Sequence, residues 1–93
     1  MFSWDARKAV RNRKKHGIPS EEAATVFADP NGLDWDDLEQ AETEPRWKRL
    51  ALSAEGRVLL VVYKLRRVGN GVETIRIISA RQASQKERKA YAG

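Results

Sequence analysis

The stretch that decides the fold is Arg57-Val58-Leu59-Leu60-Val61-Val62-Tyr63-Lys64-Leu65. Its centre, residues 58–63, is apolar at every position and rich in β-branched side chains, so both of its faces are expected to be covered. This pattern predicts the central strand of a sheet. Residues 47–53 form a second strand across a turn at 54–56, and residues 73–80 form a third strand across a turn at 68–71.

The third strand has one apolar face and one mixed face. Ile75 and Ile77 point to one side, while Arg76 and Ile78 point to the other, because successive side chains alternate along a strand. The short turns before and after the central strand predict antiparallel neighbours on both sides of it.

The N-terminal part of the chain is expected to be mainly helical. Asp5 can cap a helix over residues 6–16, and Gly17 can adopt the left-handed conformation that ends it. The expected elements before the sheet are a short strand at 2–4, helices at 6–16 and from 19 or 20 to 27, an edge strand at 33–35, and an acidic loop at 36–45.

A capping box predicts the start of the last helix. The hydroxyl of Ser84 can accept the third helical N–H while Glu87 reaches back, which opens a helix that runs to Tyr91. The expected fold class is therefore α+β in a single domain of residues 1–93. It has a short N-terminal strand, two helices, an antiparallel sheet of three or four strands, and a C-terminal helix, with the helices on one face of the sheet.

The composition excludes several kinds of site. The chain has no cysteine and one histidine, His16, which excludes disulfides, a thiolate metal site, a cysteine nucleophile and a zinc site of several histidines. We expect no cofactor. The sequence shows neither a signal peptide nor a run of about 20 apolar residues for a membrane helix, so we expect a cytoplasmic protein that does not bind membranes.

Charge is divided sharply along the chain. Residues 1–27 carry a net charge of +3, residues 28–45 carry −7, and residues 46–93 carry +9. A basic body favours a polyanionic partner such as a nucleic acid. The acidic segment, residues 34–44, is either a solvated loop or a docking site for a basic partner.

The sequence contains no local enzyme motif, but RNA cleavage needs none. RNA carries its own nucleophile, the 2′-hydroxyl, so a protein has to orient that group and stabilise charge on the phosphorus centre, which arginines do well. A nearby general base or acid would help. The candidates on the predicted sheet are Arg46, Tyr63, Arg76 and Arg81. The alternative is that the arginines are exposed on strand faces or engaged in ion pairs.

The first predicted helix offers a second group of candidates. Lys8, Asn12 and Lys15 recur at i, i+4 and i+7 and therefore share one face, which either holds phosphate or is a solvated surface. His16 is either an acid or base near neutral pH, or a structural group at the helix end. The three tryptophans, Trp4, Trp35 and Trp47, are expected in the core or at an interface rather than as platforms for bases.

Four blocks of the sequence form a specific pattern. They are Phe2-x-Trp4-Asp5-x-x-Lys8-x-x-x-Asn12-x-x-Lys15-His16-Gly17-Ile18 with Glu21-Glu22-Ala23-x-x-Val26-Phe27-x-Asp29-Pro30; Glu44-x-Arg46; Gly56-Arg57-x-Leu59-Leu60-Val61-Val62-Tyr63 with Arg66; and Arg76-Ile77-Ile78-Ser79-Ala80-Arg81-x-Ala83-x-x-x-Glu87-Arg88-x-x-Tyr91. With these blocks in this order over residues 2–91, the chain resembles the BrnT family of toxins. It departs from the usual pattern at Pro19 and in an extended basic hairpin tip at residues 65–73.

The resemblance implies a RelE-like ribonuclease fold and a toxin that cuts RNA, free or on the ribosome, to stop translation and growth. It implies an antitoxin partner similar to BrnA, with a ribbon-helix-helix part through which the complex binds operator DNA and represses its own operon. Carried over by position, the residues expected in catalysis are Arg46, Tyr63, Arg76, Arg81 and His16, and those expected to bind RNA are Lys8, Asn12, Lys15, Arg66 and Arg88. Glu87 is expected to cap a helix or pair with an arginine rather than act as a base.

Two other functions compete with the ribonuclease. One is a nucleic-acid-binding module without catalysis, which would bind RNA or DNA in a salt-dependent manner and leave the strand intact. The other is a pure interaction protein whose acidic segment binds a cationic partner.

Overall fold

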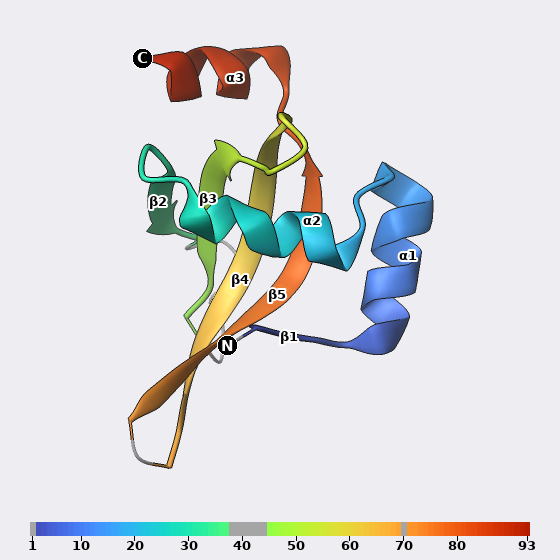
Figure 1. The fold of residues 1–93 in the computed structure, drawn as a ribbon, viewed down its shortest axis with the longest axis vertical. Coiled ribbons are helices and arrows are strands. Elements are labelled where there is room, and N and C mark those ends of the chain that lie inside the picture. Colours follow the sequence, from blue (N-terminus) through green and yellow to red (C-terminus); the bar gives the residue numbers. More distant parts are fainter. Residues whose placement is uncertain (1, 38–44, 70) are drawn as a thin grey trace.

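The computed structural model describes residues 2–37, 45–69 and 71–93 and has the expected α+β class (Figure 1). Its elements follow in the order β1 (Phe2–Trp4), α1 (Ala6–His16), α2 (Ser20–Thr25), the 3-10 helix η1 (Val26–Ala28), β2 (Leu33–Asp36), β3 (Trp47–Leu52), β4 (Val58–Val68), β5 (Val72–Gln82) and α3 (Gln85–Ala92). Residues 38–44 of the predicted acidic loop, and Asn70 of the predicted turn, lie outside the described residues.

The sheet has five strands in the order β1-β5-β4-β3-β2, so the apolar strand β4 is central as predicted. Strands β2 to β5 are antiparallel neighbours. The expectation of a purely antiparallel sheet was incomplete, because β1 adds to the free edge of β5 in parallel, with Ser3 opposite Arg76. A register shift at Val62 and Tyr63 leaves Ile78 of β5 without an opposite residue, which is a β-bulge.

The helix ends form where local side chains can cap them. The Asp5 carboxylate accepts the backbone N–H groups of Arg7 and Lys8, and Gly17 ends α1 at φ 70°. The second helix ends earlier than the predicted residue 27. It tightens into η1 at Val26, so that the Asp29 N–H reaches the Val26 carbonyl, a bond typical of a terminal 3-10 turn.

The main core lies between α2 and one face of the sheet. Leu59 and Val61 of β4 are fully buried there against Ile18, Ala23 and Val26. We call this side the helix face; in Figure 1, α2 crosses it in front of β3 and β4 while α1 stands beside β5.

The last helix does not join the others on the helix face, which corrects the expectation that all helices share one side. Ala83 donates its N–H to the Val58 carbonyl as the chain leaves β5, and α3 then crosses the end of the sheet (Figure 1). Ala83 and Tyr91 pack with Leu50 and Leu60, which alternate with the residues of the main core and therefore lie on the other face.

The remainder of that other face carries both polar and apolar side chains, and none of the described helices packs over it. We call it the open face. By strand alternation it carries the half-buried side chains Lys48, Val62, Lys64, Arg76, Ser79 and Arg81.

Candidate active site

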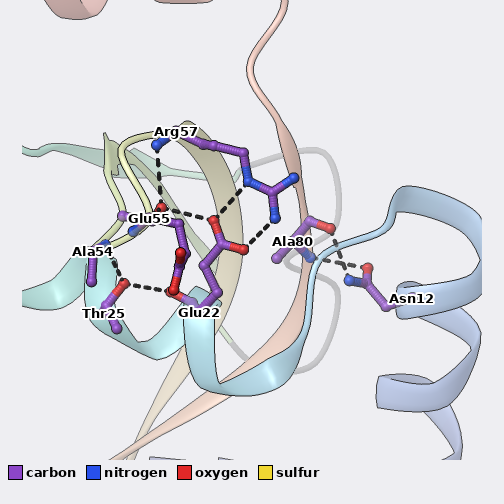
Figure 2. A network of polar contacts seen from close by, with 8 residues as sticks. Asn12, Glu22, Thr25, Ala54, Glu55, Arg57 and Ala80 are labelled. Carbon is purple, nitrogen blue, oxygen red and sulfur yellow. Dashed lines mark hydrogen bonds and ion pairs between the residues drawn. The ribbon is translucent and has the colours of Figure 1, made fainter.

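Asn12 fastens α1 to the edge of the sheet. Its side-chain N–H donates to the Ala80 carbonyl at 2.8 Å, and the Ala80 N–H donates to its side-chain oxygen at 3.0 Å (Figure 2). The amide is satisfied on both sides by the backbone of β5. These two hydrogen bonds explain how α1 is held against β5 beyond the end of β1. They also compete with the predicted role of Asn12 in binding RNA.

A pocket of about 210 Å³ lies where α1 meets β5. Its lining comprises Lys8, Arg11, Asn12, Lys15 and His16 from α1 and Ile78 and Ser79 from β5. The spacing of the α1 residues puts them on one helix side, toward the sheet. The structure therefore joins His16 to Lys8, Asn12 and Lys15, which the sequence had already placed on one helix face, and adds Arg11, which shares their helical spacing and was overlooked.

Ser79 joins this pocket to the open face. It lies opposite Val62, which lies opposite Lys48, so the three side chains form a row across β5, β4 and β3. Arg76 and Arg81 lie on the open face on either side of Ser79. Five residue steps along β5 separate them by about 16 Å, so they flank the row rather than share one point.

Arg81 is held by a carboxylate. Its Nη1 and Nη2 donate to Oε1 and Oε2 of Glu87 at 2.7 and 3.0 Å, and Nη1 also reaches the Gln82 carbonyl. The Arg81 guanidinium is the main reason that the pKa of Glu87 falls to about 2. Glu87 also accepts the N–H of Ser84, so it is both the helix cap and the arginine partner that the sequence predicted.

Tyr63 lies away from this pocket, on the helix face. Its side chain is 7% exposed, its ring meets Phe27 edge to face, and its hydroxyl donates to Asp34 Oδ1 at 2.7 Å. Burial, and then the hydrogen bond to Asp34, raise its pKa far above the ordinary tyrosine value. These features oppose proton transfer at neutral pH. They make Tyr63 a weaker candidate than His16 for the proton-transfer group.

Three other predicted residues are not brought to the pocket. Arg46 is half-buried just before β3, Arg66 is exposed opposite Thr74 in the long β4–β5 hairpin, and Arg88 donates to the Ala83 carbonyl in α3. They extend the basic surface without lining the pocket.

Arg49 illustrates the alternative that strand arginines are structural. It is 9% exposed on the helix face, where Nε donates to the Val26 carbonyl at 2.9 Å and Nη2 to the Asp29 carbonyl at 2.6 Å. Its Nη1 pairs with Asp34 Oδ2 at 2.5 Å, and its guanidinium lies over the Phe27 ring. These bonds tie η1 and β2 to β3 and leave Arg49 no part in the open face.

A wider pocket of about 660 Å³ lies on the helix side around Glu22 and Arg57. These two charges are paired with each other, and Ser53 donates to the same carboxylate, as Figure 2 shows in part. In residues 2–37, 45–69 and 71–93, no three His, Asp or Glu side chains converge as a metal site would require. None of the helices in that described part is long and apolar enough to cross a membrane.

A family model and a solved structure match this chain, and both describe the same kind of protein. The model of the family described as the ribonuclease toxin BrnT of type II toxin–antitoxin systems matches residues 4–87. The chain is also similar to the crystal structure of the Brucella abortus ribonuclease toxin BrnT, at 23% sequence identity and a TM-score of 0.65, over 91% of this chain and 99% of that one. At this identity the likeness shows the fold. A search of curated proteins found no match.

Proposed function

Because this chain belongs to the BrnT family of ribonuclease toxins of type II toxin–antitoxin systems, we propose that it cleaves RNA in the cytoplasm without a metal ion, in the α1–β5 pocket. The observation that carries the proposal is the convergence of Lys8, Arg11, Lys15 and His16 on Ser79. This convergence supplies positive charge for a phosphate and one group suited to proton transfer.

The chemistry follows from these groups. The 2′-oxygen of the RNA forms a bond to phosphorus while the bond from phosphorus to the 5′-oxygen breaks, which leaves a 2′,3′-cyclic phosphate and a 5′-hydroxyl. His16 takes the proton of the 2′-hydroxyl, and a lysine ammonium, Lys8 or Lys15, protonates the departing 5′-oxygen. Arg11 stabilises the negative charge that builds up on the phosphorane.

Arg76 and Arg81 hold the strand on either side of the scissile phosphate in this scheme. Their positions on the open face flanking Ser79 support that role. Arg81, whose guanidinium is engaged by Glu87, keeps 39% of its side chain exposed and can still offer an N–H to a phosphate.

The test uses purified protein, a defined RNA and excess EDTA. We expect fragments that end in 2′,3′-cyclic or 3′-phosphate. His16→Ala should slow cleavage by about 100-fold or more, the usual range for a lost acid or base, and one of Lys8→Ala and Lys15→Ala should do the same. The matched control is Lys14→Ala, which removes an equal charge from an exposed position of α1 outside the pocket. Loss of cleavage in EDTA would overturn the metal-free mechanism, and full activity of His16→Ala would overturn the site.

An antitoxin similar to BrnA, with a ribbon-helix-helix part, is the proposed partner. In this proposal it covers the basic open face, so RNA and antitoxin exclude each other, and it carries the operator-DNA contact through which the complex represses its own operon. A complex that cleaves RNA as fast as the free toxin would contradict this mode of inhibition.

One observation favours a second function, that of a nucleic-acid-binding component of the antitoxin complex without catalysis. Both terminal nitrogens of the Arg81 guanidinium, Nη1 and Nη2, donate to Glu87, which reduces the N–H groups available to a transition state. This alternative predicts salt-dependent RNA binding with intact strands, with or without added ribosomes.

A further inference from the structure

Trp35 lies exposed on the open face and not in the core, which was one of the two positions expected for it. It sits in β2 opposite Lys48, and its neighbour Asp34 points to the helix face, where its carboxylate bonds Arg49 and Tyr63. Alternation along the strand therefore directs Trp35 to the open face. The residue is 40% exposed, whereas Trp4 packs against the main core.

The position of Trp35 continues a row that leads to the candidate active site. Trp35, Lys48, Val62 and Ser79 are opposite one another in turn across β2, β3, β4 and β5. Neighbouring strands are about 4.8 Å apart, so three steps place Trp35 about 14 Å from Ser79. A base stacked on Trp35 therefore belongs to a nucleotide close to the one whose phosphate lies in the pocket.

The surroundings of Trp35 suit a nucleic-acid strand. Lys48, beside it in the row, keeps 31% of its side chain exposed. Its ammonium lies 3.8 Å from the buried Asp37 carboxylate, a long ion pair, so it can also meet a phosphate on its exposed side. A cation beside an exposed aromatic ring is the combination by which proteins hold single strands, because bases stack on the ring while the backbone follows the charge.

The β2 backbone beneath Trp35 is well held. The Asp34 carboxylate bonds Arg49 and Tyr63, and β2 is paired with β3 along its whole length. The backbone that carries the ring is therefore fixed before the ligand arrives, which reduces the entropy that binding must overcome.

We propose that Trp35 is a stacking platform for one unpaired base of the RNA substrate, close to the nucleotide that is cut. The proposal rests on the proposed ribonuclease function and adds a requirement to it. The substrate must be single-stranded at that base, because a paired and stacked base does not expose its face to the ring.

The test measures binding of a short 2′-O-methyl RNA, which lacks the attacking hydroxyl and stays intact. Trp35→Ala should weaken binding by about 5- to 150-fold, the loss expected for one base–aromatic stack, while Trp35→Phe keeps most of the affinity. The matched control is Leu33→Ala, an apolar truncation on the same strand and face with 43% exposure, which should change affinity less than about twofold.

A scan with single abasic sites identifies the base. At one position, removal of the base should weaken binding to the unaltered protein and leave no further loss for Trp35→Ala. Equal losses from Leu33→Ala, unchanged binding by Trp35→Ala, or a Trp35 effect that persists at every abasic position would each overturn the inference. Because the probe cannot be cleaved, a Trp35-dependent stack in a protein that cuts no RNA would refute the proposed function alone.

Discussion

Replacement of Glu22 by glutamine tests the buried ion pair that joins α2 to the β3–β4 turn. The Glu22 side chain is 5% exposed and its oxygens face only donors, namely Arg57 Nε at 2.9 Å, Arg57 Nη2, and Ser53 Oγ at 2.8 Å (Figure 2). In the Glu22→Gln variant, one carboxylate oxygen becomes an N–H₂ group that points at a donor. Either orientation of the amide therefore loses at least one hydrogen bond and leaves the charge of Arg57 without its partner.

The expected cost is at the lower end of the range for a broken buried pair. Losing one partner of such a pair typically costs 3–5 kcal/mol, but the Arg57 side chain is 35% exposed and water can solvate part of its charge. We therefore expect a loss of about 2–3 kcal/mol in the free energy of unfolding. For a domain of this size that loss lowers Tm by about 10–20 °C.

The assay is urea unfolding followed by circular dichroism at pH 7, with Glu21→Gln as the control. Glu21 is the exposed neighbour on the same helix, and its neutralisation should change the unfolding free energy by less than about 0.5 kcal/mol. A Glu22→Gln loss as small as that of the control would refute the reasoning.

The same pair predicts a pH dependence with a definite sign. The hydrogen bond from Arg57 is the main reason that the pKa of Glu22 lies below its ordinary value of 4.5. The carboxylate therefore contributes its full stability above pH 4.5 and loses it as the pH falls through the lowered pKa. The gap in stability between the unaltered protein and Glu22→Gln should be widest near neutrality and shrink in acid.

Two further predictions concern the candidate site. Asn12→Ala should lower the free energy of unfolding by about 1–3 kcal/mol, because it leaves two backbone groups of Ala80 unpaired. The affinity of the variant for RNA should change less than about twofold. Weaker RNA binding at unchanged stability would instead support direct contact of Asn12 with RNA. The pKa of Glu87 is lowered to about 2, chiefly by Arg81 and also by the Ser84 N–H, so its carboxylate should stabilise the fold fully above the ordinary pKa of 4.5 and progressively less toward pH 2. Glu87→Gln should therefore reduce the fall of the urea midpoint between pH 4.5 and pH 2. An unchanged fall would count against the ion pair of Glu87 and Arg81.

The features that local sequence determined are those whose partners lie within a few residues. Asp5 caps α1 through N–H groups two and three positions away, and Ser84 and Glu87 cap α3 across the same span. The apolar run at residues 58–63 likewise predicted the central strand, because a run of β-branched and apolar side chains favours a strand with neighbours on both sides. The resemblance to the BrnT family came from residues read in order, and the family match confirms it.

Tertiary structure decided what each charged or aromatic side chain does. Arg49, Arg76 and Arg81 look equivalent in the sequence, yet one is buried against η1, one lies on the open face and one is engaged by Glu87. A shift of one position along a strand moves a side chain from the core to the open face, and the partners that then fix its role come from distant segments.

The pocket itself could not be foreseen for the same reason. His16 and Ser79 line one pocket because β1 pairs in parallel with β5 and Asn12 then fixes α1 to Ala80, 68 residues farther along the chain. The sequence by itself determined the elements, their caps and the family, since these depend on short-range pattern. Only the packed sheet decided that the basic face of α1 lies beside Ser79 of β5, because that placement depends on register and on contacts between residues far apart in the chain.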